Sequence, residues 1–201
     1  MLTAAVIGLC LISTAKAEFS FYLIDNFESG KADKWYHFGN VAADLTRNPS
    51  LEAGVQDTIA DSCGDYSLKI KGKTAGWYIG GIGAELLTDA APFSRFQMDV
   101  NGNSAGGKIK VELFCYDNSP SSEAKKTNHK WIAEVSILGQ GFSRISIPFS
   151  SFKADGPATT EGGWQPNKNG SNILQSIQFI LLAAQATGEA EADIDNILLT
   201  Y

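Results

Sequence analysis

The feature that most constrains the fold of this chain is an alternation of apolar and polar residues with a period of two. Its clearest run covers residues 108–116, and the apolar members of that run are Ile109, Val111, Leu113 and Cys115. Successive side chains of a β-strand point to opposite faces of the sheet, so these four residues share one face. No stretch of the chain carries a sustained helical stripe with a cap at each end. The chain is therefore predicted to be all-β.

The same period returns in segments that turn residues separate from one another. Those segments are residues 66–70, 96–100, 131–137 and 142–149. Pro148 predicts an edge strand or a strand end in the last of them. Residues 177–183 are almost continuously apolar, as expected of a strand that is covered on both faces. With a first strand at 19–27, the segment 77–81 and a last strand, about nine or ten strands result, which predicts a two-sheet antiparallel β-sandwich of the jelly-roll type.

The first 17 residues have the composition of a secretory signal peptide and end in Ala15-Lys16-Ala17, an A-x-A cleavage pattern. Their apolar run is shorter than the roughly 20 residues that span a bilayer. No other stretch is suited to membrane insertion, so the protein is expected to be secreted or periplasmic. Residues 18–201 are expected to form one domain, because neither side of the polar segments 118–130 and 153–172 could close a sandwich alone.

Charge and cysteine content restrict the partners and leave the redox state open. The formal net charge is −6, without a block of like charges, which argues against nucleic acid as a partner. Removal of the signal peptide would leave Cys63 and Cys115. In an oxidising compartment these two residues could form a disulfide worth about 4 kcal/mol in the chain-entropy model. The alternative is two free thiols, with Cys115 at an inward-facing strand position, and the sequence gives no geometry that decides between the two states.

The order of these segments resembles the galactose-binding-like β-jelly-roll modules, and most closely the family-11-type carbohydrate-binding modules and the complex I intermediate-associated protein-like domains. The motifs that carry the resemblance are LIDNFESG (23–30), GDYSLKIKG (64–72), FSRFQMDVNGNSAGGKIKVELF (93–114), KWIAEVSI (130–137), FSRISIPFSSF (142–152), ILQSIQFIL (173–181) and EADIDNILL (191–199). They cover nearly all of the chain after the expected signal peptide. The resemblance implies a jelly roll, and it speaks for the fold more strongly than for the ligand.

The resemblance also implies a structural calcium ion. In the modules that the chain resembles, the first and last strands lie near one another and commonly share such an ion. Ca²⁺ prefers six to eight oxygen ligands from carboxylates and carbonyls. The candidate ligands are Asp25 and Glu28 from the first segment and Asp193 and Asp195 from the last, where alternation puts the two aspartates on one side of an extended strand. The alternative interpretation is that these are solvated turn carboxylates, or that Asp195 caps a turn.

Sugar binding usually rests on aromatic faces that stack on pyranose C–H groups, helped by a few hydrogen-bonding side chains. The expected ligand-binding residues are Trp164, Tyr116, Glu112, Tyr78 and Asp99. Trp164 lies in a Gly-rich polar loop, where no apolar period requires a large ring. Tyr116 and Glu112 share the non-core face of their strand, with Asp99 expected on a neighbouring strand. One of Trp77 and Tyr78 is expected to be exposed and the other buried. The alternative is that this face is an ordinary solvated surface.

The leading functional hypothesis is a secreted, non-catalytic protein that recognises a polysaccharide. A glycosidase would need two carboxylates about 5 to 10 Å apart in a cleft, and no acidic pair stands out. Neither His37 nor His129 has the spacing of a metal ligand or of a nucleophile's base, so the chain is predicted not to be an enzyme. The alternative is an extracellular surface, matrix or assembly protein that uses the sandwich for protein contacts.

Overall fold

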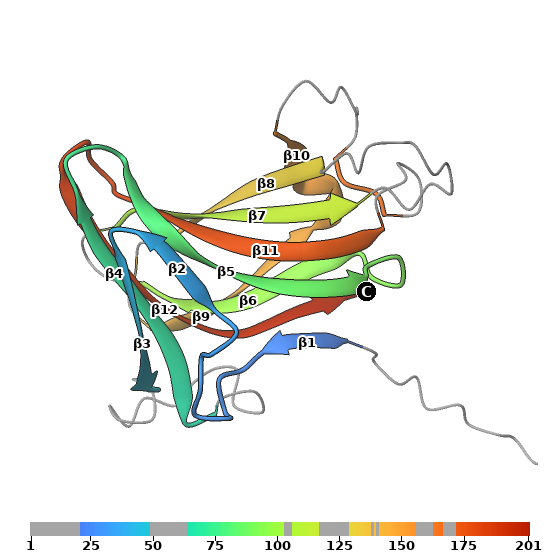
Figure 1. Ribbon diagram of the computed structural model, residues 1–201, viewed down its shortest axis with the longest axis horizontal. Helices are drawn as coiled ribbons and strands as arrows, with labels where there is room; N and C mark the ends of the chain where they lie inside the picture. The colour runs from blue at the N-terminus through green and yellow to red at the C-terminus, as the bar shows by residue number, and fades with distance from the viewer. Residues whose placement is uncertain are drawn as a thin grey trace, which may run out of the picture.

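The computed structural model describes residues 21–48, 64–102, 106–116, 129–137, 139, 141–155, 163–166 and 172–201. Their strands form two antiparallel six-stranded sheets that pack face to face (Figure 1). The predicted two-sheet β-sandwich is therefore confirmed. The expected signal peptide, residues 1–17, lies outside the described residues. Within the described ranges, no helix has the length and hydropathy needed to cross a membrane.

The first sheet, called sheet 1 below, contains both the first and the last strand of the chain. Its strand order is β3-β4-β12-β6-β9, and β1 also pairs with β12. The strands are β1 (Tyr22–Asp25), β3 (Val41–Arg47), β4 (Tyr66–Thr74), β6 (Arg95–Asn101), β9 (Phe142–Pro148) and β12 (Gly188–Thr200). β9 forms the edge of the sheet and ends at Pro148, as that proline predicted, because proline has no N–H to donate to a further strand.

The second sheet, sheet 2, has the strand order β10-β8-β7-β11-β5-β2. The strands are β2 (Tyr36–Gly39), β5 (Tyr78–Asp89), β7 (Lys108–Tyr116), β8 (His129–Ser136), β10 (Lys153–Ala154) and β11 (Ile173–Leu182). A single 3₁₀ turn, η1 (Phe149–Ser151), connects β9 to β10. The bounds of β7 match the predicted run 108–116. The strands β2, β3 and β10 were not predicted, since they are short or lack a clear alternation.

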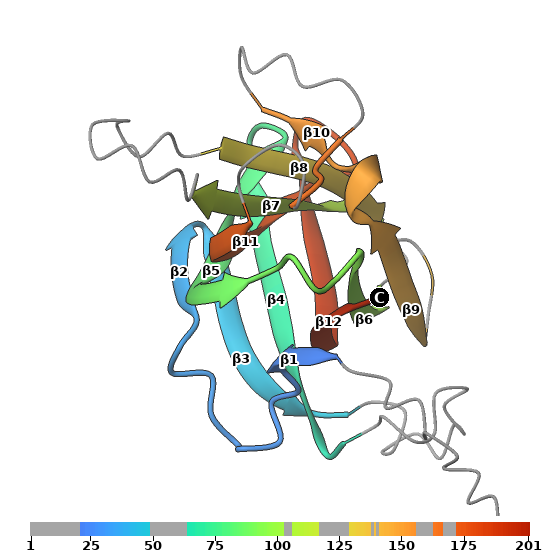
Figure 2. The ribbon, with the colours of Figure 1, turned by 90° about the vertical axis from the view of Figure 1, so that its right-hand side faces the viewer.

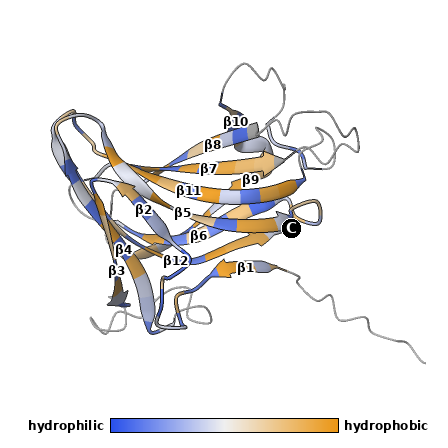
Figure 3. Ribbon diagram, viewed as in Figure 1, coloured by the Kyte–Doolittle hydropathy of each residue, from blue (hydrophilic) through white to orange (hydrophobic). Residues whose placement is uncertain are grey.

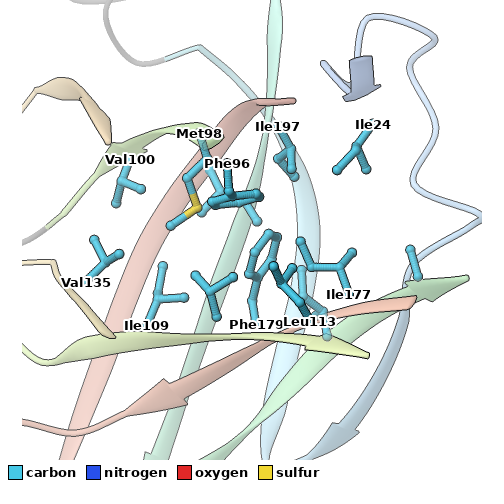
Figure 4. Packing of buried hydrophobic residues seen from close by; sticks show 14 of the residues in the cluster. Ile24, Phe96, Met98, Val100, Ile109, Leu113, Val135, Ile177, Phe179 and Ile197 are labelled. Carbon is cyan, nitrogen blue, oxygen red and sulfur yellow. The ribbon is translucent and has the colours of Figure 1, made fainter. Parts of the chain in front are cut away.

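The core lies between the two sheets and is filled by the inward-facing apolar residues of both. Figure 4 shows Phe96, Met98 and Ile197 of sheet 1 facing Leu113 and Phe179 of sheet 2, and all five are fully buried. Hydrophobic and hydrophilic residues alternate along the strands of each sheet (Figure 3). Each fully buried large side chain contributes roughly 1.5–3 kcal/mol to folding, so this alternation fixes which face of every strand remains outside.

The first and last strands are neighbours, as the resemblance implied. β1 runs antiparallel to the end of β12, with Tyr22 opposite Leu199, Leu23 opposite Leu198 and Asp25 opposite Ile197. Figure 2 shows the two strands side by side. The two Ile-Asp-Asn triplets of the sequence therefore meet through the fold. A bulge interrupts β12 between Asp195 and Leu198, where Asn196 adopts a left-handed conformation (φ 45°).

Cys115 is a free cysteine, and its side chain is fully buried in the core. Burial raises the pKa of its thiol far above the usual range, because a thiolate loses its hydration in an apolar environment. Cys63 lies outside the described residues, but Cys115 is a free thiol, so the disulfide considered from the sequence is not formed and the alternative of a free, inward-facing Cys115 holds. A thiol in this state is inert toward oxidants that act on thiolates.

Candidate functional site

The outer face of sheet 2 carries two aromatic rings that lie over glycines. Tyr36 and Phe38 of β2 stand opposite Gly83 and Gly81 of β5 in the sheet register. A Cβ atom added to Gly83 would lie 2.5 Å from Cζ of Tyr36, and one added to Gly81 would lie 2.7 Å from Cζ of Phe38. The two ring centroids are 6.2 Å apart with the planes tilted by 35°. We call this pair the aromatic platform; it exists because β5 has no side chains at these two positions.

A set of polar side chains continues from the platform across the neighbouring strands. Gln178 of β11 is the register partner of Gly83, and its Nε2 donates a hydrogen bond of 2.9 Å to the hydroxyl of Tyr36. Glu112 of β7 is the register partner of Gln178 on the other side. We call Gln178, Glu112, Lys110 and Lys130 the polar row. It supplies amide, carboxylate and ammonium groups that can exchange hydrogen bonds with hydroxyls.

Glu112 is the electrostatic centre of the polar row. It is 4% exposed, and Oε1 accepts contacts from Nζ of Lys110 at 2.7 Å and from Nζ of Lys130 at 3.5 Å. Lys130 also forms an ion pair with Asp155. The hydrogen bond to Asp155 and, next among the favourable effects, the charge of Glu112 raise the pKa of Lys130. The hydrogen bond from Lys130 in turn lowers the pKa of Asp155. Two lysines and two carboxylates balance in charge, so this surface suits a neutral ligand.

Glu112 and Tyr78, two of the five residues expected to bind a ligand, lie on this side of the molecule. Tyr78 begins β5, is half-exposed, and stands opposite Leu182 of β11. Tyr116 ends β7 opposite Ile173, but its side chain lies outside the described part of the structure. Trp77 and Tyr78 are both exposed, so the expectation that one of them is buried was wrong. A bulge in β5 between Tyr78 and Gly80 interrupts the alternation of inward and outward side chains at the start of the strand.

The prediction that Trp164 stacks on a sugar was wrong. Its ring is 0% exposed and packs on Phe149 with the centroids 4.3 Å apart. The backbone N–H of Trp164 also donates to the carbonyl of Phe149 at 3.1 Å. Gly163 approaches Ser150 so closely that a Cβ atom there would lie 2.1 Å from the Ser150 carbonyl oxygen. Gly163 and Trp164 therefore lie against Phe149 and Ser150, and the tryptophan is part of the core.

The placement of Asp99 beside Glu112 was also wrong. Asp99 belongs to β6 in sheet 1, whereas Glu112 belongs to β7 in sheet 2. The Asp99 side chain is almost fully buried. Its two oxygens accept hydrogen bonds from Arg144 Nε at 2.5 Å and Nη2 at 2.7 Å, and Asn196 Nδ2 donates to Oδ2 at 2.9 Å. A carboxylate engaged in this way has a structural role in sheet 1.

Sequence reasoning missed the aromatic platform. Tyr36 and Phe38 are two residues apart, as are Gly81 and Gly83. This matching pair of i, i+2 patterns was a usable signal. It was not decisive, because nothing in the sequence states that β2 pairs with β5 in the register that puts each ring over a glycine.

Of the four carboxylates proposed as calcium ligands, Asp25 and Glu28 bind groups of the protein itself. Asp25 accepts hydrogen bonds from Phe27 N at 3.0 Å and Trp35 Nε1 at 2.7 Å, and Lys34 Nζ lies 3.2 Å from its Oδ2. Lys34 also donates to the carbonyl of Ile24. Glu28 accepts hydrogen bonds from the backbone amides of Asp65, just before β4, and Tyr66, its first residue, at 2.9 and 3.0 Å.

The two carboxylates of β12 lie on the outer side of sheet 1. Asp193 contacts Thr46, Asn101 and Lys69, and burial raises its pKa. Asp195 is almost fully buried, and Asn196 N donates to its Oδ1 at 2.6 Å. Burial raises the pKa of Asp195 to about 8 against this hydrogen bond, and the charges of Asp99, Glu28 and Asp25 add to the increase.

These four side chains do not fit a calcium site in the arrangement observed. Among the residues that the structure describes, no three acidic, histidine or cysteine side chains are placed to hold one ion. All four carboxylates already accept hydrogen bonds from amides, a hydroxyl or an indole, whereas Ca²⁺ needs six to eight free oxygen ligands. The calcium ion stays a prediction of the resemblance.

No protein-family model matches the chain, and none of the curated proteins matches it either. Solved structures do match. The family 11 carbohydrate-binding module from Clostridium thermocellum in complex with a β-1,3-1,4-mixed-linked tetrasaccharide is 16% identical, with a TM-score of 0.55 over 90% of this chain and 95% of that one. The chain has the fold of a carbohydrate-binding module.

Two further solved structures have the same fold. The CBM22-1 xylan-binding domain of Paenibacillus barcinonensis Xyn10C is 16% identical, with a TM-score of 0.50 over 90% of this chain and 94% of that one. A non-crystalline-cellulose-specific module, CBM28, is 10% identical, with a TM-score of 0.56 over 88% of this chain and 92% of that one. The resemblance to carbohydrate-binding modules of the jelly-roll type is thereby confirmed at the level of the fold.

Proposed function

We propose that this protein binds a neutral polysaccharide without cleaving it, through the aromatic platform and the polar row of sheet 2. The observation that carries the proposal is the pair of rings, Tyr36 and Phe38, that lie across two glycines beside hydrogen-bonding side chains. Ring faces contact the C–H faces of pyranoses, while a few polar groups fix the hydroxyls. The solved structures of similar fold support this class of ligand, since their names include a mixed-linked glucan tetrasaccharide, xylan and non-crystalline cellulose.

The chemistry of the polar row supports binding over hydrolysis. A glycosidase needs one carboxyl group that is held protonated to serve as the acid. Glu112 contacts two lysine ammonium groups, and the pKa of Asp155 is lowered by Lys130. A carboxyl group whose pKa is lowered, as in Asp155, is not suited to deliver a proton at neutral pH, and Glu112 is engaged as the partner of two ammonium groups. Outside the cell such a protein meets polysaccharides directly, so we propose that residues 1–17 direct its secretion or its export to the periplasm.

The outer side of sheet 1 offers a poor surface for sugars by comparison. Its β3, β4 and β12 positions carry a lattice of ion pairs, including Lys69 with Glu191 at 2.9 Å and Lys73 with Glu189 at 3.1 Å. Such exposed pairs remain hydrated and contribute at most about 1 kcal/mol each. The outer side of sheet 2 carries ion pairs as well, but it adds the two rings of the aromatic platform, and these rings favour sheet 2 as the binding surface.

Affinity electrophoresis in gels that contain mixed-linkage β-glucan, soluble xylan or hydroxyethyl cellulose tests the proposal. We expect wild-type protein to be retarded by at least one of them. Tyr36→Ala and Phe38→Ala should weaken that binding by about tenfold or more. Tyr66→Ala removes a partly exposed ring from β4 of sheet 1 and serves as the matched control. Unretarded wild-type protein in every gel would overturn the proposal, and release of reducing sugar would overturn its non-catalytic part.

A patch of apolar side chains near the chain ends favours protein contacts as a second candidate function. Phe21, Leu23 and Tyr201 are exposed, and the Tyr201 ring lies 6.0 Å from that of Phe93. Clustered exposed apolar residues mark interaction surfaces more often than scattered ones do. Under this candidate, Phe21→Ser with Tyr201→Ser would abolish self-association or partner capture in light scattering and cross-linking, while Tyr36→Ala would leave it unchanged.

The calcium ion inferred from the resemblance is also a proposal. The group of carboxylates around Asp195 supports it: burial is the main cause of the raised pKa of Asp195, and a cation would offset the further increase caused by the charges of Asp99, Glu28 and Asp25. The hydrogen bonds that all four carboxylates already accept oppose it. A melting temperature that falls with EDTA and recovers with added Ca²⁺ would support the ion, because a ligand bound only by the native state stabilises it. An unchanged melting temperature would remove it.

A further inference from the structure

Trp77 is the exposed one of the four tryptophans of the chain. Its side chain is 59% exposed, whereas Trp35, Trp131 and Trp164 are buried. It lies in the turn between β4 and β5, immediately before Tyr78. A large ring on the surface has no role in the core, and tryptophan is the side chain with the largest aromatic face for stacking.

The turn holds the backbone of Trp77 in place. The hydroxyl of Thr74 donates to the carbonyl of Tyr78 at 2.7 Å and accepts from Gly76 N at 2.9 Å. On the other side, Ala183 N donates to the carbonyl of Trp77 at 2.9 Å. The backbone that carries the ring is thus fixed before any ligand arrives. Fixing a group in advance lowers the conformational cost of binding.

Beside the ring is a pocket of about 320 Å³ lined by Trp77, Gly107, Lys108, Glu134, Leu182, Ala183 and Ala184. Leu182 and the two alanines supply apolar surface. Lys108 and Glu134 form an ion pair of 2.7 Å at the rim. Gly107 allows close packing, since a Cβ atom there would lie 2.6 Å from the Leu182 carbonyl oxygen. The pocket combines an aromatic wall, an apolar surface, one donor group and one acceptor group, which matches the C–H face and hydroxyl edge of a pyranose.

The pocket is separate from the aromatic platform but lies on the same side of the sandwich. Lys108 precedes Lys110 by two residues on β7, and Glu134 is the register partner of Lys110. Phe38 lies over Gly81 of β5, and Tyr36 lies over Gly83. At about 3.4 Å per residue, the start of β5 at Tyr78 is about 10 Å from Gly81 and about 17 Å from Gly83. One extended ligand could therefore contact the platform and Trp77 together, whereas a short ligand could not.

We propose that the pocket beside Trp77 is a second subsite that holds one pyranose unit of a neutral polysaccharide, so that the bound chain runs along β5 from Tyr36 toward Trp77. This proposal rests on the proposed function, since it takes the platform as the first subsite. The unit is neutral because the ammonium of Lys108 is already paired with Glu134. A uronate would have to displace that carboxylate.

Tryptophan fluorescence gives a direct test, because Trp77 is the exposed tryptophan. We expect a long oligosaccharide of whichever glycan retards the protein to reduce acrylamide quenching of the wild-type emission. A disaccharide of the same glycan should leave quenching unchanged. Trp77→Phe should abolish the effect while keeping a ring for stacking. Unchanged quenching with a saturating long oligosaccharide would overturn the second subsite.

Titration calorimetry over a series of oligosaccharide lengths gives the second measurement. For wild type we expect affinity to rise with length, and for Trp77→Ala we expect that rise to shrink by about five- to tenfold, with short ligands unaffected. Equal affinities of wild type and Trp77→Ala at every length, or an equal loss at every length, would overturn the proposal. Melting temperatures of Trp77→Ala and of the control Tyr66→Ala verify that both variants are folded.

The same titrations separate this proposal from the one it rests on. Tyr36→Ala should lose affinity at all lengths, because it removes the first subsite. If wild type binds no glycan, the proposed function fails. If wild type binds and Tyr36→Ala weakens all ligands while Trp77→Ala changes none, the platform stands and the second subsite alone fails.

Discussion

The ring of Tyr36 occupies the space that a side chain on Gly83 would fill: a Cβ atom at Gly83 would lie 2.5 Å from the Tyr36 hydroxyl oxygen. The orientation of the Tyr36 ring on β2 thus depends on the absence of a side chain at Gly83 on β5. Tyr36 OH also accepts from Gln178, so the ring is held from below by the glycine and at its edge by an amide.

Gly83→Val should therefore weaken glycan binding without touching any ring. The added methyl groups would lift Tyr36 off β5, and we expect affinity in calorimetry to fall by about tenfold and stability by about 1–3 kcal/mol. Gly188→Ala is the control, because its Cβ would meet its nearest neighbour at an ordinary contact distance of 3.7 Å. Wild-type affinity of folded Gly83→Val would contradict a role for the Tyr36 orientation.

Glu112→Gln should destabilise the protein by about 1–3 kcal/mol in urea unfolding. The substitution keeps the shape of the side chain but leaves Lys110 and Lys130 without the buried carboxylate that both contact. The matched control is Glu189→Gln, which breaks an exposed pair with Lys73 and should change stability by less than about 0.5 kcal/mol. Equal effects of the two substitutions would mean that the buried position of Glu112 adds nothing to the free energy of unfolding.

The stability of the wild-type protein should depend on the ionisation of Asp195. Burial raises its folded-state pKa to about 8 from the ordinary 3.8, so between these values the native state binds a proton that the unfolded state has lost. The free energy of unfolding then falls as the pH rises through this window and levels off above it. Asp195→Asn, which cannot ionise, should give a flatter profile of melting temperature between pH 4 and pH 8. If wild type and Asp195→Asn gave parallel profiles in the presence of EDTA, the proposal that native Asp195 is buried and protonated would be contradicted.

Trp164→Ala should affect stability and leave binding unchanged. The ring is fully buried against Phe149, and removing a large aromatic side chain from a core costs about 3–5 kcal/mol. Below its lowered melting temperature the variant should retain wild-type affinity for the glycan. Loss of affinity in a variant that circular dichroism shows to be folded would restore Trp164 to the binding site.

The alternation of the sequence predicted the strands well because core burial fixes which face of a strand turns inward. β7 begins and ends where the pattern does, and Pro148 ends its strand as expected. The pattern does not state which sheet a strand joins. Asp99 and Glu112 lie on consecutive strands of the chain, yet the connection between them crosses from one sheet to the other.

Loop composition was a weaker guide than strand pattern. The glycines around Trp164 predict an exposed loop, but Gly163 permits a close approach to Ser150 that places the tryptophan in the core. Prediction of the aromatic platform would have required knowledge of which strands pair. Tyr36 and Gly83 are far apart in the chain, and only the pairing of β2 with β5 brings the ring over the glycine.

The pairing of β1 with β12 determines which end of the sandwich would point away from a support to which the C-terminus is attached. Tyr22 lies opposite Leu199 at one end of the sandwich, while Gly188, at the start of β12, pairs with Thr74 at the β4–β5 hairpin. Figure 1 shows that hairpin on the side opposite to the C-terminus. A fusion partner or solid support joined at Tyr201 would therefore hold the protein by its base, with Trp77 directed away from the support and toward the polymer.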